Sequence, residues 1–272
     1  MAKLNDHSSL KYVKALYMGD PGTAKTGSLT SLVAAGYKLR IYDFDNLLGS
    51  LVQYVNKECP AKAENVSFQT FTDKQKGVDN PLVMAGGAMK VVPFVDGMPD
   101  AFSRALKQLN HWKTADEDFG PASAFGEDTV VVIDSLTSMS NAAFRYVQYM
   151  NPGARDQQAY YHAAQQLVMS VISLLGSEGF QTNVILIAHL HYSENQVGLT
   201  KGFPRAVGAA LGPQIGAYFN AVLLAESTNN SRVIRTNSTG IVDLKNPAPF
   251  KVGDKLPLNT GLADFFTAVR SI

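Results

Sequence analysis

The chain has little cysteine and little charge. Cys59 is the only cysteine among 272 residues, which excludes an internal disulfide and a cysteine-based metal cluster within one chain. Charged residues make up 17% of the chain and the net charge is +1, so bulk charge does not indicate a polyanionic partner. Any nucleic-acid binding therefore has to come from a local patch.

Long hydrophobic runs are also missing. The first residues, Met1 to Ser9, are polar and contain no apolar signal core. The longest apolar run, Val184 to Ala188, has the length of a strand and is far below the ~20 residues that span a bilayer. We therefore expect a cytoplasmic protein that has no membrane partner.

The sequence does contain an alternation of strand and helix patterns. Tyr12 to Met18 and Lys38 to Phe44 have the pattern of strands, and they flank a glycine-containing loop and a helix over 27–35. Thr129 to Ile133 is a continuous β-branched run, and Asn183 to Ala188 has the pattern of another buried strand. Such runs are typical of central parallel strands buried on both faces. The pattern predicts an α/β fold with a mainly parallel central sheet flanked by helices.

Other segments are assigned more coarsely. We expect one domain over 1–272, with a partly irregular insertion at 59–128, and a mobile loop where glycine and proline gather at 191–217. The remaining expected elements are a strand at 66–71, a loop or small insertion at 80–97, helices at 99–112, 156–175 and 262–269, and a surface loop at 114–128. Short strands at 219–224, 233–236 and 241–245, with a turn at 237–240, predict a C-terminal β-hairpin.

The loop after the first strand matches the P-loop pattern of Gly, four residues, Gly, Lys, and Ser or Thr, except at one position. Its backbone N–H groups and the following helix N-terminus suit phosphate oxygens, Lys25 suits the β- and γ-phosphates, and Thr26 suits Mg²⁺. Ala24 replaces the second glycine of the pattern, and we expect a crowded position that weakens binding. The predicted nucleotide-binding residues are Gly19, Asp20, Pro21, Gly22, Thr23, Ala24, Lys25 and Thr26.

Carboxylates follow two of the predicted strands. Asp134 ends the run Val130 to Ile133, where it suits Mg²⁺ beside Thr26, and it also suits the N-cap of the next helix. Asp43 and Asp45 follow the second strand, and on an extended chain their side chains point the same way. Either one suits a general base that polarises water, or a solvated strand end.

A histidine follows the strand Asn183 to Ala188. Ligands of open α/β sheets bind at the carboxyl ends of the strands, so His189 suits a sensor of the γ-phosphate. A satisfied buried histidine is the alternative.

Taken in order, these motifs resemble those of the RecA-like ATPases: the P-loop, Asp43-Phe-Asp45, the strand end at Asp134-Ser135, and Ile187-Ala-His189. The tail segments starting at Arg232 and at Asp243 look most like phage proteins of the Sak single-strand-annealing group. The resemblance covers roughly residues 12–270.

The resemblance implies a magnesium-dependent, DNA-stimulated ATPase that acts in phage recombination or replication inside the host cell. Asp45 takes the place of the catalytic glutamate, and His189 that of the γ-phosphate sensor. The loop 192–216, with Lys201 and Arg205 as its strong bases, takes the place of a DNA-contacting loop, and Lys245 that of a basic finger directed at a neighbour's ATP. Implied partners are single-stranded DNA, further copies of the chain with ATP at their interfaces, and a single-strand-binding protein.

Three other functions stay open on the sequence alone. The weak net charge favours a KaiC-like ATPase that acts on protein partners without DNA. A small-molecule kinase usually needs an arginine-rich lid, and the sequence shows no obvious one. Ala24 and the short side chain of Asp45 are also consistent with a nucleotide-binding module that does not turn over.

Overall fold

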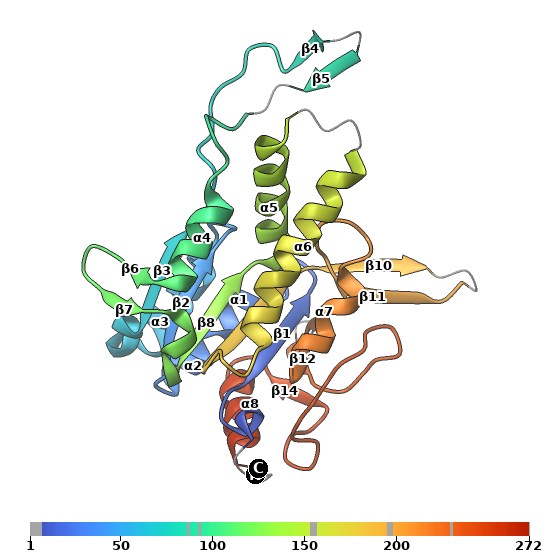
Figure 1. Cartoon of the computed structure of the whole chain (residues 1–272). Coiled ribbons are helices and arrows are strands. Elements are labelled where there is room, and N and C mark those ends of the chain that lie inside the picture. Colours follow the sequence, from blue (N-terminus) through green and yellow to red (C-terminus); the bar gives the residue numbers. More distant parts are fainter. Residues whose placement is uncertain are drawn as a thin grey trace.

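The computed structural model describes residues 7–85, 88–91, 94–152, 157–194, 198–228 and 231–271. Its centre is an eight-stranded sheet (Figure 1). Its strands are β1 (Lys14–Gly19), β2 (Lys38–Asp43), β3 (Val66–Thr70), β8 (Gly126–Asp134), β9 (Thr182–Ala188), β12 (Ala221–Thr228), β13 (Ser231–Arg235) and β14 (Lys255–Pro257). They lie in the order β14-β13-β12-β1-β9-β8-β2-β3. From β12 to β3 all neighbours are parallel, whereas β13 and β14 add to the β12 edge in antiparallel fashion.

Helices cover both faces of the sheet. Leu16 and Met18 of β1 belong to one apolar cluster, and Ala15 and Tyr17 of the same strand belong to the other. The first cluster includes side chains of α4 (Ala101–Asn110), α5 (Leu136–Met150) and α6 (Gln157–Gly176), and the second those of α2 (Thr30–Ala34), α3 (Gly49–Glu58) and α8 (Gly261–Arg270). The predicted α/β fold with a mainly parallel sheet is confirmed.

The parallel strands bring their carboxyl ends to one edge of the sheet. The register pairs Asp43 with Asp134 on β2 and β8, and Met18 with Ala188 on β1 and β9. The segments that follow these strands therefore begin close together. This is the place where open α/β sheets bind ligands.

The helix expected over 27–35 begins earlier and is divided. It starts within the loop as α1 (Lys25–Ser28) and continues after Leu29 as α2. The Ser28 hydroxyl donates to the Lys25 carbonyl at 2.7 Å, and the Ser31 hydroxyl donates to the Ser28 carbonyl at 2.9 Å. Serine side chains that bond to nearby backbone carbonyls weaken regular helix geometry, which accounts for the break.

The segment 80–97, expected as a loop or small insertion, contains a β-hairpin. β4 (Leu82–Ala85) pairs with β5 (Ala88–Val91) and stands away from the sheet beyond α4 and α5 (Figure 1). Met84 and Met89 on this hairpin are exposed. The expected surface loop 114–128 likewise contains β7 (Asp118–Gly120), paired with β6 (Trp112–Lys113), then the turn η4 (Ala122–Ala124) and the start of β8.

The segment 191–217, expected as a mobile loop, forms regular elements in its described residues. β10 (Leu190–Glu194) and β11 (Thr200–Pro204) form an antiparallel hairpin, followed by α7 (Gly212–Ile215) and η5 (Gly216–Tyr218). Glycine here supports close packing, because a Cβ at Gly212 would lie 2.8 Å from the Pro204 carbonyl oxygen.

The C-terminal hairpin exists, but its predicted turn at 237–240 is wrong. The hairpin consists of β12 and β13, and the segment 241–245 does not pair with β13. Val242 instead bridges Gly202 of β11, and Lys245 bridges Val222 of β12. The chain also contains the short 3₁₀ helices η2 (Ser8–Leu10) and η3 (Pro60–Asn65). Within the described ranges, no helix combines the length and apolar character needed to cross a membrane.

Candidate functional site

The P-loop connects β1 to α1 and uses glycine at two positions for different reasons. A Cβ at Gly19 would lie 2.7 Å from the Ala225 carbonyl oxygen and 2.8 Å from Thr23 Oγ1, so this position tolerates no side chain. Gly22 has a φ of +81°, a conformation that side chains rarely adopt. The loop conformation therefore depends on both glycines.

Ala24 has left-handed backbone angles, with φ 62° and ψ 32°. Such a conformation costs a residue with a Cβ roughly 1–2 kcal/mol, whereas glycine adopts it freely. The sequence suggested that crowding is the difficulty at this position. The structure shows that backbone conformation favours glycine there.

The Lys25 side chain folds back over the P-loop. Its Nζ donates to the carbonyl oxygens of Gly19 and Asp20, each at 2.9 Å. An ammonium has three donors, so one remains for a phosphate oxygen. Burial lowers the pKa of Lys25, while the charges of Asp134, Asp20 and Asp45 oppose that shift.

Thr26 and Asp134 meet at the carboxyl end of β8. The Thr26 hydroxyl donates to Asp134 Oδ2 at 2.6 Å. Burial raises the pKa of Asp134 to about 6, although the Thr26 hydrogen bond acts in the opposite direction. The Asp134 carboxylate is thus buried, and a bound cation would stabilise its charged form.

This pair suits magnesium. Mg²⁺ is usually held by one or two carboxylates together with substrate phosphates and water, and not by a complete protein cage. Among the described residues no group of three or more histidine, cysteine or acidic side chains is placed to hold a metal ion. Thr26 and Asp134 are the residues that would hold Mg²⁺ here. The alternative role of Asp134 as an N-cap is wrong, because the Ser135 side chain caps α5.

Asp43 and Asp45 have different surroundings, and the prediction that they point the same way is wrong. The strand ends at Asp43, whose Oδ1 accepts from the backbone N–H groups of Asp45 and Asn46 at 3.2 and 2.7 Å. Asp43 therefore stabilises the turn. Asp45 lines the cavity at the P-loop, and its Oδ1 accepts from the Ser135 hydroxyl at 3.2 Å.

His189 lies beside Asp45, with 4.0 Å between Nε2 and Asp45 Oδ2. Burial lowers the pKa of His189, and the positive charge of Lys25 lowers it further. Its Nδ1 is buried and has no hydrogen-bond partner among the described residues. The Nε2 atom, on the side of Asp45, is the nitrogen placed for a hydrogen bond to a ligand in this cavity.

The remaining predicted bases are engaged within the chain or lie beside the site. Lys245 Nζ donates to the Gly216 carbonyl at 2.8 Å and to the Phe219 carbonyl at 3.3 Å. Lys201 pairs with Asp243 at 2.9 Å. The Arg205 backbone N–H donates to the His189 carbonyl at 2.7 Å, so this residue lies next to His189.

The hairpin of β10 and β11 contacts the P-loop directly. Tyr192, on β10, donates its hydroxyl to Asp20 Oδ2 at 3.3 Å. This hydrogen bond links the hairpin to the second residue of the P-loop. A displacement of β10 would therefore be transmitted to Asp20 through this hydrogen bond.

A cavity of about 630 Å³ adjoins these groups. Lys25, Thr26, Asp45, Asp134 and His189 line it, which brings together most of the predicted site. Six further lining residues were not predicted from the sequence: Leu47, Ser50, Gln53, Tyr54, Lys57 and Arg232. All but Arg232 lie within 12 residues after Asp45, four of them on α3, so they are close to it in the sequence. Arg232 is brought to the cavity by the pairing of β13 with β12, which no local pattern indicates.

Comparison with protein families gives a match over most of the chain. The model of the AAA domain matches residues 11–248, a range that contains the P-loop, Asp134, His189 and Arg232. Among curated proteins, none matches this chain significantly. The family match supports ATP binding and ATPase activity. The chain belongs to the AAA domain family of P-loop ATPases.

Proposed function

We propose that this protein is a magnesium-dependent ATPase that acts on single-stranded DNA in phage recombination or replication, as its resemblance to the Sak-type group implies. The observation that carries the ATPase part is the Thr26–Asp134 hydrogen bond beside Lys25, with Asp45 and His189 lining the same cavity. Copies of the chain would assemble on the DNA with ATP at their interfaces, and a single-strand-binding protein would be a further partner.

The site residues have different roles in hydrolysis. Lys25 binds the β- and γ-phosphates, and Thr26 and Asp134 hold the magnesium ion, which when bound neutralises phosphate charge. Asp45 accepts a proton from the attacking water, and Ser135 holds its carboxylate in place. His189, neutral because of its lowered pKa, donates a hydrogen bond to the γ-phosphate.

The DNA part of the proposal rests on the hairpin of β10 and β11. It extends from the strand end that carries His189 and bonds to the P-loop through Tyr192. Single-stranded DNA bound to this hairpin would therefore affect both His189 and the P-loop. Phe203 on β11 and the exposed Tyr192 offer rings for base stacking.

A second candidate is an ATPase that acts on protein partners without DNA. Two observations favour it: Lys201, one of the two strong bases of the hairpin region, is paired with Asp243, and the hairpin of β4 and β5 exposes Met84 and Met89. Methionine-rich exposed surfaces commonly serve protein contacts.

The two candidates differ in the response of ATP hydrolysis to DNA. We expect purified protein to hydrolyse ATP with magnesium, and single-stranded DNA to stimulate turnover at low salt and less at high salt. Lys25→Ala is the control for the active site, and it should remove turnover with and without DNA. Turnover that ignores DNA at both salt concentrations would contradict the DNA proposal and favour the protein-partner candidate.

A double variant locates the DNA contact. Lys201→Ala with Arg205→Ala should weaken single-strand binding and reduce its salt dependence, because two phosphate-binding cations are lost. Lys38→Ala with Lys107→Ala is the matched control, since these exposed lysines lie on β2 and α4. Equal DNA affinity of the two double variants would exclude the hairpin as the contact.

A further inference from the structure

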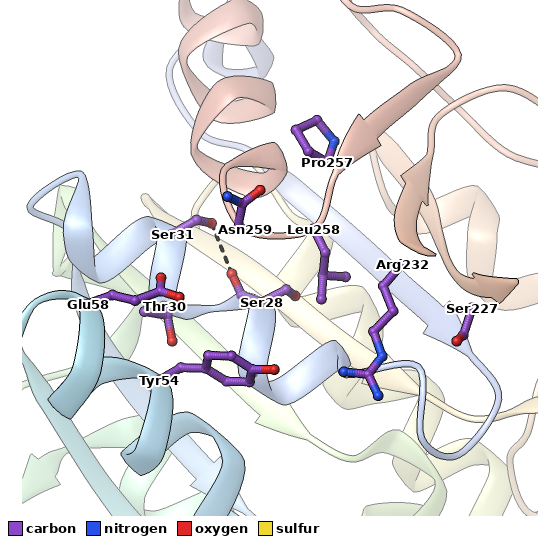
Figure 2. Close-up of a pocket in the computed structure, with 11 residues that line it drawn as sticks. Ser28, Thr30, Ser31, Tyr54, Glu58, Ser227, Arg232, Pro257, Leu258 and Asn259 are labelled. Carbon is purple, nitrogen blue, oxygen red and sulfur yellow. Dashed lines mark hydrogen bonds between the residues drawn. The ribbon is translucent and has the colours of Figure 1, made fainter. Parts of the chain in front are cut away.

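A second cavity lies next to the P-loop cavity. It has a volume of about 550 Å³ and runs along α1 and α2 toward β14 (Figure 2). Tyr54 and Arg232 line both cavities, so they stand where the two adjoin. A ligand that fills both cavities passes between these two side chains.

Tyr54 is held against the P-loop helix. A Cβ at Gly27 would lie 2.9 Å from the Tyr54 ring carbons Cδ2 and Cε2, so the glycine allows the ring to approach the α1 backbone. The ring is half-buried and borders the second cavity from below in Figure 2. It offers an aromatic surface directly beside the phosphate site.

The rest of the second cavity combines apolar walls with a few polar groups. Pro257 and Leu258 supply apolar surface, while Glu58 and Asn259 supply a carboxylate and an amide (Figure 2). The Thr30 hydroxyl is buried and has no hydrogen-bond partner within the described residues. Flat apolar surface with a polar rim suits a nucleobase, whose faces stack and whose edges form hydrogen bonds.

Arg232 carries a charge that the described part of the chain does not neutralise. Along β13, Ile234 is buried in the core on the side of α8, and Arg232 lies on the same face of the strand two residues earlier. Figure 2 shows its side chain reaching from β13 toward the P-loop helix. Arg235 of the same strand pairs with Glu226, whereas no described carboxylate lies within ion-pairing distance of Arg232.

The cations of the P-loop cavity match a polyphosphate. Lys25, Lys57 and Arg232 line it, against the carboxylates of Asp45 and Asp134, of which Asp134 is the one suited to magnesium. A guanidinium recognises phosphate through two parallel hydrogen bonds, which an ammonium cannot reproduce. Arg232 is thus equipped to bind phosphate oxygens at the junction of the two cavities.

We propose that the nucleotide lies across both cavities, with its base in the cavity lined by Thr30, Glu58 and Asn259, and that Arg232 binds its phosphates from the same chain. The inference rests on the proposed ATPase function and assigns a residue and a base subsite to it. It makes the antiparallel edge of the sheet part of the nucleotide site. It also differs from the Lys245 finger, which would come from a neighbouring copy.

Calorimetric titration with ATP and with inorganic tripolyphosphate tests the role of Arg232. Arg232→Ala should weaken the binding of both ligands about ten- to a hundredfold, the range for losing a charge-assisted hydrogen-bonded pair. Arg232→Lys should restore only part of the affinity. Lys255→Ala, an exposed lysine on the adjacent β14 that lines neither cavity, should bind as the wild type does.

A second variant tests the base subsite. Tyr54→Ala should weaken ATP binding and leave tripolyphosphate binding unchanged, because tripolyphosphate has no base to stack. Wild-type affinity of Arg232→Ala for both ligands, or equal losses of both in Tyr54→Ala, would overturn the proposal. Tight ATP binding without DNA-stimulated turnover would remove the DNA function and leave the base subsite and Arg232 standing. Thermal melting of each variant verifies that it is folded.

Discussion

The parallel and antiparallel parts of the sheet contribute to the site in different ways. β1, β8 and β9 each bring one group by ending at the same edge: the P-loop, Asp134 and His189. The antiparallel part contributes Arg232 from within β13. Lys245 follows in a segment that forms only isolated bridges, and it does not line the cavity. Strand ends have fixed places in a parallel sheet, so local patterns locate them. Residues of the antiparallel edge depend on pairings between distant segments.

The largest expected effect lies in the parallel part, at Asp134. Asp134→Asn should reduce magnesium-dependent turnover roughly 100-fold, because an ionised ligand is lost. The same change should stabilise the fold by about 2–3 kcal/mol above pH 7, because the wild type then holds a buried carboxylate whose pKa is raised from 3.8 to about 6.

The pH dependence of this stabilisation tests whether the ionisation of Asp134 is its cause. A raised pKa means that the folded state binds more protons than the unfolded state between pH 3.8 and about 6, so wild-type stability falls as the pH rises through that window. Urea unfolding should therefore give equal stabilities near pH 4 and a growing advantage of the variant up to pH 7. A difference that does not change with pH would exclude ionisation of Asp134 as its source.

A smaller effect is expected in the antiparallel part, at Lys245. Its Nζ bonds to the carbonyls of Gly216 and Phe219, so Lys245→Met should lower the free energy of unfolding by about 1 kcal/mol. Turnover per folded molecule should be unchanged if these bonds are its role. Lys255→Met, on exposed β14, is the control for loss of charge. Lost turnover with unchanged stability would instead support the finger acting on a neighbour's ATP.

The smallest effect is expected at Ala24, in the P-loop that follows β1 of the parallel part. Ala24→Gly should raise the free energy of unfolding by roughly 0.5–1 kcal/mol, since relief of the left-handed conformation exceeds the entropy that glycine adds to the unfolded chain. Ala34→Gly in α2, where the backbone is helical, should lower it by a similar amount. Denaturant unfolding of both variants gives the comparison, and equal signs would contradict the explanation.

The sequence predicted most of the fold because most of the sheet is parallel. The unbroken apolar runs at β8 and β9 and the segment around the P-loop specify buried strands on their own. The hairpins of β4 with β5 and β10 with β11 were missed, since glycine and proline there resemble an irregular loop. The turn at 237–240 was placed wrongly because Val242 and Lys245 bond to β11 and β12, and their own neighbours in sequence give no sign of this.

The site shows the same division. Lys25, Thr26, Asp134, Asp45 and His189 were predicted from patterns and line one cavity. Asp43 was not separated from Asp45, because only the folded turn shows that its oxygen accepts backbone N–H groups. Arg232 looked like any surface base until the pairing of β13 placed it beside the P-loop.

The sheet order has a consequence for the chain as it leaves the ribosome. β1 precedes the other seven strands of the central sheet in the chain, yet its two neighbours are β9 and β12, which follow only at Thr182–Ala188 and Ala221–Thr228. Until residue 182 has been made, the strand that leads into the P-loop therefore has neither of its neighbours. A nascent chain interrupted before residue 182 carries the complete phosphate-binding sequence without the sheet that shapes it. Nucleotide binding should therefore begin only after β9 and β12 have been made and have paired with β1.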